Sequence, residues 1–285
     1  MLRPPYKRYE RLHVYHLDSV DLPALTDADL IGIWLEDGTP ILFFHKPKDE
    51  LISGLCHELG CKVIYQAVLD YADWEAGQDI APFSLAGLTV APVWSKEPAD
   101  IRLDPSVIFG TGFHPSTRLC LETLGKYCNT PELNLRTMLD LGTGTGLLAI
   151  AAARLGLSSI TGVDHNPLAC EVARNNVALN LCRESVTIRE MDLRREEPDT
   201  AVDLVVANLY HNLLAELFSR PSFWRARLYL VAGFVPSMEE DLLAALPANR
   251  VRLLERRRSE RWCLWVLAPK TAPRENGDND NIVES

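Results

Sequence analysis

The sequence predicts a two-domain α/β protein, in which a helix-covered, mostly parallel sheet follows a smaller mixed α/β unit. The first observation is length, because 285 residues exceed one small module and allow about two domains. The second is a change of pattern near residue 103, after which strand-like runs alternate with helical ones. The third is composition: 47% hydrophobic and 24% charged residues exclude a mostly disordered or fibrous chain.

Residues 1–93 are expected to form the smaller domain, followed by a linker at 94–102. Two apolar runs flank a turn at Asp37-Gly38, which is typical of a β-hairpin. Apolar residues at helical spacing come next, and a further apolar run returns as a strand. The expected elements are a hairpin at 31–45, a helix at 48–59 and a strand at 61–69.

Residues 103–270 are expected to form the larger domain, and the tail at 271–285 lacks periodicity and is expected to be disordered. Asn166 and Pro167 are expected to cap and open one of its helices. The last two strands have no helix between them, which predicts a hairpin and an antiparallel final strand. Strands are expected at 137–141, 159–164, 185–190, 203–208, 227–234, 251–256 and 262–268, and helices at 147–155 and 167–180.

The charge is −10 overall and is unevenly distributed. Residues 1–100 carry 8 Lys and Arg against 16 Asp and Glu, which suits either a basic partner or a solvated face that only aids solubility. The acidity argues against direct nucleic-acid binding. No apolar run approaches the roughly 20 residues of a membrane span. Seven scattered cysteines without a C-x-x-C pair indicate no metal site and a reduced cytoplasmic setting. We also expect a monomer.

The strongest local signal is a glycine loop, LDLGTGTG at 139–146. Gly142, Gly144 and Gly146 follow a strand and precede a helix, which permits a tight turn and close approach of a ligand. Asp164 ends the next strand, where a carboxylate can accept the ribose hydroxyls of a nucleoside. The spacing lacks the gap before the third glycine of a dinucleotide site, and no Lys follows as in a P-loop. The loop therefore favours S-adenosylmethionine, an adenosyl ligand without phosphates.

Other polar residues lie where ligands bind in open α/β sheets, beyond the carboxyl ends of strands. Asp192 either reaches an adenine amino group or is an ordinary loop residue. Asn208 can accept N–H hydrogen bonds from an amine, although a helix cap is the alternative. With Tyr210 it forms the pair of candidate catalytic residues. Asp140 and Asn166, beside the glycine loop and the following strand, complete the expected cofactor-binding set.

Upstream of the glycine loop, LDPSVIFGTGFHPSTRLCLETL at 103–124 closely resembles the signature of the ribosomal protein L11 methyltransferase (PrmA) family. The resemblance continues through GVDHNPLA, ARNNVALN and LVVANLY and covers most of 60–235. It implies a seven-stranded doubly wound (Rossmann-like, class I) S-adenosylmethionine-dependent methyltransferase domain. It also implies a smaller N-terminal α+β (ferredoxin-like) domain that captures the substrate, and a flexible linker.

The family's activity is trimethylation of the α-amino group and lysine ε-amino groups of a basic ribosomal protein, with S-adenosyl-L-homocysteine as the product. The resemblance therefore implies a protein partner. This chain departs from the family where Arg261 replaces an acidic residue before Trp262, near the expected approach of the substrate. The family's cofactor positions match Thr117, Gly142, Asp164 and Asn208, and its loop over the methionine end matches Phe109, Gly110 and Thr111.

The expected chemistry is direct in-line transfer of a methyl group to a neutral amine, aligned by the protein. His114 could be a general base, but we favour a role in ordering the loop beside Pro115. Three alternatives stay open. They are a lysine methyltransferase with another target, such as an electron-transfer flavoprotein subunit, a small-molecule or glutamine methyltransferase, and a non-catalytic binding module. The absence of prolines after Asn208 counts against a glutamine enzyme.

Overall fold

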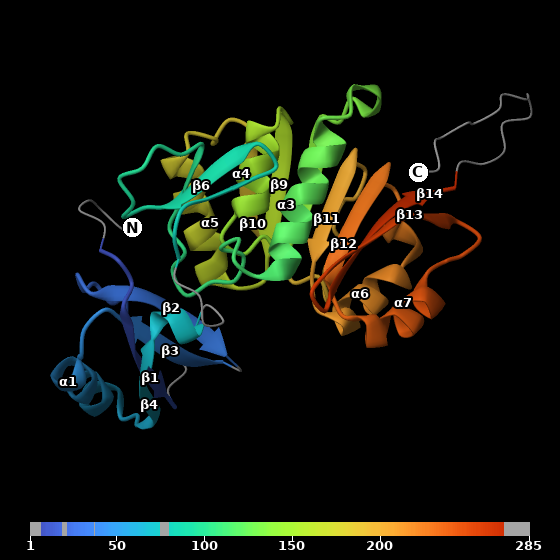
Figure 1. Ribbon diagram of the computed structural model, residues 1–285. Coiled ribbons are helices and arrows are strands. Elements are labelled where there is room, and N and C mark those ends of the chain that lie inside the picture. The colour runs from blue at the N-terminus through green and yellow to red at the C-terminus, as the bar shows by residue number, and fades with distance from the viewer. Residues whose placement is uncertain (1–6, 19–21, 37, 75–79, 271–285) are drawn as a thin grey trace, which may run out of the picture.

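The computed structural model describes residues 7–18, 22–36, 38–74 and 80–270, so the tail at 271–285 and Asp37 of the expected turn lie outside the described residues. The chain folds into a small lobe and a larger one built on a seven-stranded sheet (Figure 1). Their relative placement matters for function, because residues of both lobes meet near the carboxyl ends of the large sheet's parallel strands.

The small lobe is a four-stranded antiparallel sheet in the order β2-β3-β1-β4. Ile52 and Leu55 of its long helix pack against Tyr15 and Leu42 of the sheet. The connectivity is that of a ferredoxin-like β-α-β-β-α-β unit, except that the described residues between β1 and β2 form no helix. The elements are β1 (Arg11–Leu17), β2 (Leu30–Glu36), β3 (Thr39–Phe44), α1 (Asp49–Leu59), β4 (Val63–Asp70) and α2 (Tyr71–Trp74).

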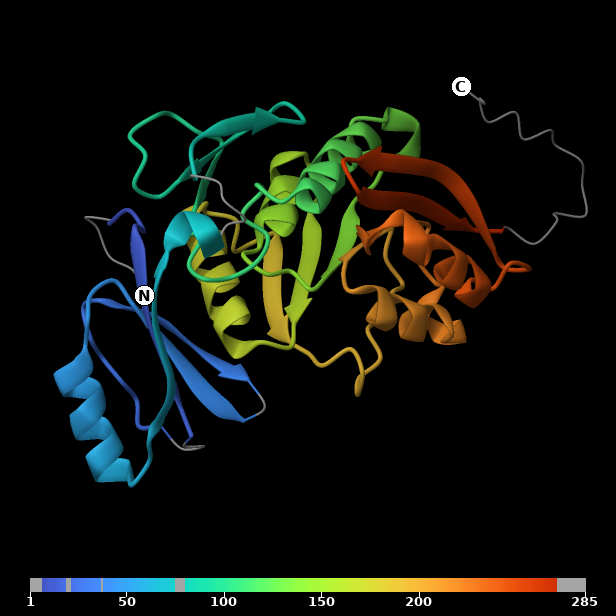
Figure 2. The same ribbon diagram turned by 60° about the horizontal axis from the view of Figure 1, so that its bottom comes forward.

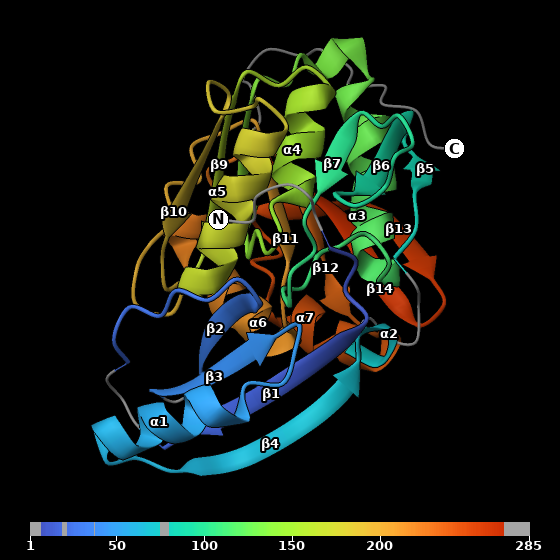
Figure 3. The same cartoon turned by 90° about the vertical axis from the view of Figure 1, so that its left-hand side faces the viewer.

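A second, three-stranded sheet contains β5 (Phe83–Leu85), β6 (Leu88–Pro92) and β7 (Ile101–Leu103). It lies beside α3 and α4 of the large lobe (Figure 3). The guanidinium of Arg118, on α3, lies 5.1 Å from the centre of the Phe83 ring. The expected linker at 94–102 therefore runs through a folded unit that packs on the large lobe, and β7 begins inside it.

The large sheet has the order β10-β9-β8-β11-β12-β14-β13. Its first five strands are parallel, while β14 is antiparallel to both neighbours, which confirms the predicted closing hairpin. The predicted doubly wound fold is also confirmed: α3, α4 and α5 cover one face, and α6 and α7 cover the other (Figure 2). The strands are β8 (Thr137–Leu141), β9 (Ser159–Asp164), β10 (Val186–Glu190), β11 (Leu204–Asn208), β12 (Leu228–Phe234), β13 (Val251–Ser259) and β14 (Trp262–Pro269). The helices are α3 (Pro115–Cys128), α4 (Leu147–Arg154), α5 (Pro167–Leu179), α6 (His211–Phe218) and α7 (Glu239–Ala245), with short 3-10 turns at Pro131–Leu133, Pro221–Phe223 and Pro236–Met238.

The two lobes share an apolar cluster to which α5 contributes Leu168, Ala169 and Val172. Leu168, in the first turn of α5, lies so close to Gly32 of β2 that a Cβ there would come within 2.6 Å of its side chain. Because α5 begins just after β9 ends, the small lobe is held at the carboxyl edge of the parallel strands. This is the edge where open α/β sheets bind ligands.

Within the described ranges, no helix combines the length and apolarity that crossing a membrane requires. The same part of the chain contains no group of three or more His, Cys, Asp or Glu residues arranged to hold a metal ion.

Candidate functional site

The glycine loop joins β8 directly to α4. Gly142, Gly144 and Gly146 have φ angles of 70°, 54° and 82°, in the left-handed region that other residues rarely adopt. The amides of Gly142 and Thr143 both donate to the carbonyl of Val163 at 2.9 Å, which ties the loop to the end of β9. The predicted strand–loop–helix unit is therefore present, and its bend needs glycine.

Asp164 stands at the end of β9, beside this loop. Its Oδ2 accepts from the Gly144 amide and its Oδ1 accepts from the Asn166 amide, both at 3.0 Å. A carboxylate has about four acceptor sites, so each oxygen keeps capacity for one more donor. The side chain is 12% exposed, and His165 Nδ1 lies 3.6 Å from its Oδ1, so a contact with ribose hydroxyls stays a prediction.

Asn166 and Asp140 lie near the loop but are engaged by the protein. The Asn166 side chain accepts from the Leu168 amide at 2.9 Å, so the predicted cap of α5 is confirmed. Asp140 is buried beneath the loop and accepts from the Thr143 hydroxyl at 2.7 Å. Burial raises the pKa of Asp140 to about 7. In these positions both residues shape the site, and contact with a cofactor stays a prediction for each.

A segment at 104–112 folds against the glycine loop, although 26 residues separate the two in sequence. The Thr145 amide donates to the Phe109 carbonyl at 3.1 Å, and the Thr145 hydroxyl donates to the Gly110 carbonyl at 2.7 Å. A Cβ on Gly144 would lie 2.3 Å from the Phe109 carbonyl oxygen, so the two backbones can approach only because residue 144 is glycine. The Phe109 ring is half exposed, whereas Thr111 is buried.

Asn208 ends β11 on the other side of the glycine loop. Its Nδ2 donates to the hydroxyl of Thr117 at 3.4 Å, and Thr117 itself is buried in the first turn of α3. The Asn208 carboxamide oxygen has no hydrogen-bond partner in the part of the chain that the structure describes. Tyr210 precedes α6 and is 83% exposed, so its ring is available to a large partner.

Asp192 follows β10, and its carboxylate contacts residues of its own loop. Its carboxylate accepts from the Arg194 amide at 2.9 Å and lies 3.4 Å from the guanidinium of Arg195. No described contact joins it to the other expected site residues, so a bond to an adenine amino group stays a prediction.

His114 lies at the start of α3 and packs between two aromatic rings. The centre of the His114 ring lies 5.0 Å from that of Phe109 and 4.5 Å from that of Trp262. The Nδ1 atom of His114 accepts from the Ser116 amide and lies 2.8 Å from the Ser116 hydroxyl. Burial, followed by the charge of Arg261, lowers the pKa of His114. These contacts favour the interpretation that His114 orders the loop.

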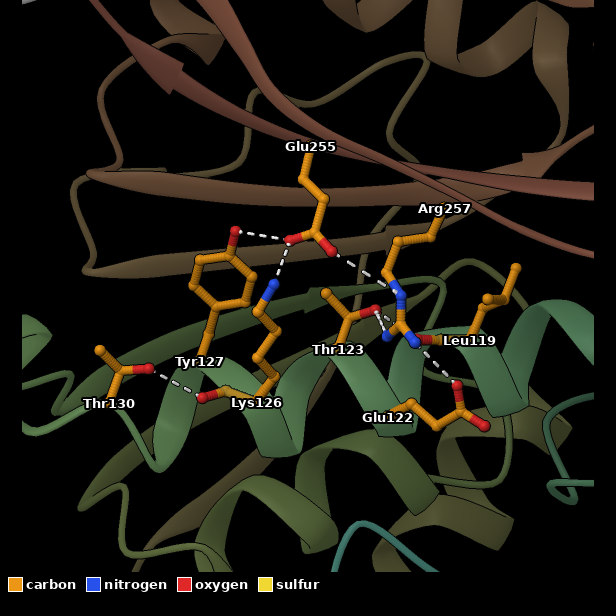
Figure 4. Close-up of polar contacts among 8 residues, drawn as sticks. All are labelled: Leu119, Glu122, Thr123, Lys126, Tyr127, Thr130, Glu255 and Arg257. Atoms are coloured by element: carbon orange, nitrogen blue, oxygen red, sulfur yellow. Dashed lines mark hydrogen bonds and ion pairs between the residues drawn. The ribbon is translucent and has the colours of Figure 1, made fainter. Parts of the chain in front are cut away.

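The hairpin that carries Trp262 is fastened to α3 by a polar network (Figure 4). Glu255 of β13 accepts from Lys126 at 2.8 Å and from the Tyr127 hydroxyl at 3.0 Å. Arg257 donates to the Thr123 hydroxyl at 2.7 Å and to the Glu122 carboxylate at 3.0 Å. These bonds fix the hairpin on the helix that supplies His114 and Thr117. Sequence reasoning missed the network, because its two halves are about 130 residues apart.

Sequence reasoning also missed Asn176, which is fully buried on α5. Its carboxamide accepts from the Asp104 amide at 2.8 Å and donates to the carbonyls of Asp104 and Thr145, each at 2.9 Å. One turn later, Asn180 makes the same kind of paired bonds to the backbone of Arg102. The available signal was two asparagines four residues apart within a helix, where this residue type is unfavourable unless its amide is used.

Residues 49–269 match the family model described as "Ribosomal protein L11 methyltransferase (PrmA)". The chain is 32% identical over 193 residues to the ribosomal protein L11 methyltransferase of Carboxydothermus hydrogenoformans, covering 65% of this chain and 62% of that protein. It is 31% identical over 208 residues to that of Caldicellulosiruptor saccharolyticus, covering 70% and 66%. The chain thus spans less than two thirds of either relative. A solved ribosomal protein L11 methylase from Lactobacillus delbrueckii subsp. bulgaricus superposes with a TM-score of 0.58 at 25% identity, over 67% of this chain and 100% of that one.

Proposed function

The chain belongs to the ribosomal protein L11 methyltransferase family, and we propose that it transfers methyl groups from S-adenosylmethionine to amino groups of ribosomal protein L11. The observation that carries the proposal is the carboxamide of Asn208. Its oxygen is free to accept an N–H bond at the carboxyl end of β11, on the opposite side of the glycine loop from Asp164. Such a group suits an amine as the methyl acceptor.

The described residues fit the cofactor. The loop has glycine at 142, 144 and 146 in the left-handed region, and Asp164 keeps two acceptor sites for ribose hydroxyls. The Phe109 ring, half exposed above the loop, offers an apolar cover for the methionine end. When bound, S-adenosylmethionine supplies a methyl group that its sulfonium has already activated toward a nucleophile.

The protein's own task is to present a neutral amine in line with that methyl group. A free lysine titrates near about 10.4 and is charged at neutral pH, so the site has to favour the uncharged form. Contact with the rings of Phe109 and Tyr210 would remove water from the amine, and desolvation disfavours an ammonium ion. Asn208 would hold an N–H and align the lone pair. Holding both reactants together in line is worth about 7–11 kcal/mol in well-aligned systems, and this bond supplies one part of that alignment. Asn208 cannot take a proton, so water receives it.

Lysine ε-amino and N-terminal α-amino groups are the acceptors we propose. Both are primary amines, and each stands at the end of a side chain or of the chain itself, where it can enter a site on the enzyme surface. The activity test is incubation of the purified chain with labelled S-adenosylmethionine and purified ribosomal protein L11, followed by intact-mass analysis and peptide mapping. We expect mass increments of whole methyl groups on the ribosomal protein. Asn208→Ala should abolish transfer, and titration with S-adenosylhomocysteine then separates loss of the amine contact from loss of the cofactor contact that the resemblance implies for the same residue. Full activity in that variant would remove the role assigned to Asn208.

A different labelled protein in a cell lysate, with none on the ribosomal protein, would retain the chemistry and reassign the target. Binding of the cofactor with no transfer to any protein would instead favour a non-catalytic module.

The free edge of the small lobe is where we propose that the protein substrate docks. β4 pairs only with β1 among the described residues, and it lies along the outer edge of that sheet (Figure 3). Ile64, Tyr65 and Val68 are each 55% exposed, and the strand carries no charge before Asp70. Proteins usually protect such an edge with charges or proline, because it can accept another strand. The net charge of −8 over residues 1–100 favours a basic extended segment as the occupant and opposes a second copy of this acidic chain.

Ile64→Lys tests this docking, and Leu35→Lys on the opposite edge strand β2 is the matched control, with 51% of its side chain exposed. We expect the first variant to raise the KM for the ribosomal protein and leave the KM for S-adenosylmethionine unchanged. The control should change neither. Equal KM values in all three proteins would exclude β4. A wild-type dimer that Ile64→Lys dissociates would show that the edge binds another copy.

A further inference from the structure

Two tyrosines of the small lobe reach the segment that forms one wall of the proposed cofactor site. The hydroxyl of Tyr9 donates to Oδ1 of Asp104 at 2.8 Å, and the hydroxyl of Tyr71 donates to the carbonyl of Ser106. All four residues are buried, and the two tyrosine rings contact each other with centres 4.9 Å apart. Both bonds end on the chain just before Phe109 and Gly110.

The first bond continues as a chain of hydrogen bonds to the glycine loop. Asp104 accepts from Tyr9 through its side chain, and its backbone amide and carbonyl both bind the carboxamide of Asn176. The same Nδ2 of Asn176 donates to the carbonyl of Thr145 at 2.9 Å. Thr145 in turn binds the carbonyl of Phe109. The small lobe is therefore joined to the glycine loop by direct contacts, with no gap in the series.

The second bond holds a strained point of the same segment. Ser106 has a φ of 49°, a left-handed conformation that is unfavourable for a residue other than glycine. Its hydroxyl is buried and has no hydrogen-bond partner among the described residues. Local preference therefore does not explain this conformation, and the surroundings have to maintain it. The bond from Tyr71 to the Ser106 carbonyl is one such restraint.

From these contacts we infer that Tyr9 and Tyr71 are positioning residues for the cofactor site, so that docking of the small lobe and binding of the cofactor favour each other. The inference rests on the proposed function, because it takes S-adenosylmethionine as the ligand of the glycine loop. With the tyrosines in place, the wall at 104–112 lies against Thr145. Without either bond, that wall has more conformations to lose when the ligand binds. Coupling of this kind is reciprocal.

The test compares Tyr9→Phe and Tyr71→Phe with Tyr15→Phe. Tyr15 is a buried tyrosine of the same lobe whose hydroxyl contacts Asp49 and the amide of Lys48, away from the cofactor wall. Calorimetric titration with S-adenosylhomocysteine should show affinity weakened about fivefold or more in the first two variants, the lower limit of typical couplings. The control should stay within about twofold of wild type. In turnover, the KM for S-adenosylmethionine should rise while kcat at saturation is unchanged.

Hydrogen exchange supplies the reciprocal measurement on the wild-type chain. Bound S-adenosylhomocysteine should slow amide exchange around Tyr9 and Tyr71 and leave α1 unaffected. Unchanged affinity in both variants overturns the inference, as does an equal loss in Tyr15→Phe, which would indicate general destabilisation. Unchanged exchange at both tyrosines also overturns it, because a coupled equilibrium has to act in both directions. A wild-type chain that binds no S-adenosylhomocysteine overturns the proposed function itself, together with this coupling.

Discussion

Gly144→Ala is expected to disable the cofactor site with little change elsewhere in the fold. The new Cβ would lie 2.3 Å from the Phe109 carbonyl oxygen, whereas ordinary contact begins at 3.4 Å. That oxygen belongs to backbone and cannot rotate away. The segment at 104–112 therefore has to move by about 1 Å, which is the difference between the two distances.

The energetic cost has two parts. A left-handed φ of 54° costs a residue other than glycine about 1–2 kcal/mol. Displacing the wall breaks the two hydrogen bonds from Thr145 to Phe109 and Gly110, each worth about 1 kcal/mol net. We therefore expect the free energy of unfolding to fall by about 3–4 kcal/mol.

Gly60→Ala is the matched control, because Gly60 has a φ of 67° and a Cβ there would meet nothing within 4 Å. It should lose only the conformational part, about 1–2 kcal/mol in urea denaturation. S-adenosylhomocysteine titration should show at least about tenfold weaker binding in Gly144→Ala, since a loss of about 1.4 kcal/mol in binding corresponds to tenfold. The control should bind as wild type does. Equal binding by the two variants would refute the idea that the close approach of 104–112 builds the site.

Three further substitutions test the surroundings of the site. Burial raises the pKa of Asp140 from 3.8 to about 7, so in that pH range the folded state holds a proton that the unfolded state has lost. The free energy of unfolding should therefore fall as pH rises from about 4 to 7 and then level off, and Asp140→Asn should flatten this slope in urea titrations at several pH values. Asn176→Ala leaves three buried backbone groups without their bonds and should cost about 3 kcal/mol or more, whereas Asn175→Ala is the control, because the Asn175 side chain makes no hydrogen bond to a described residue. Arg257→Met removes the two bonds to α3 and should cost about 1–2 kcal/mol by denaturation, against less than about 0.5 for Arg252→Met on the same strand.

The large sheet could be predicted from sequence because its strands are buried on both faces. LVVAN of β11 is an example, because four of its five residues are fully buried and a strand buried on both faces has to be continuously apolar. The run is short and has polar residues at both ends, which makes it recognisable as a strand. The glycine loop was equally visible, because the bend requires left-handed backbone at three alternating positions. Both features depend on residues that are close together in the sequence, so the sequence pattern predicts them.

The walls of the site could not be predicted in the same way. Asn176 binds Asp104, which is 72 residues away, and no periodicity in either segment indicates the other. The three-residue strands β5 and β7 are too short for alternation to be recognised, so the sequence predicts no sheet there and a linker at 94–102. Likewise, Asp140 and Asp164 are the same residue type in the sequence. Only burial in the fold distinguishes the carboxylate beneath the loop from the one beside it.

The bonds that meet at Thr145 link the proposed binding of the cofactor to that of the protein substrate. One residue of the glycine loop bonds the 104–112 wall through its amide and hydroxyl, and α5 through its carbonyl. The wall is in turn bonded to the small lobe by Tyr9. If the proposed coupling holds, a cofactor that steadies the wall also steadies the lobe that presents β4 to the protein substrate. The cofactor-loaded chain then loses less conformational freedom when the substrate docks, so S-adenosylmethionine should strengthen capture of the protein, and bound protein should strengthen binding of the cofactor by the same factor.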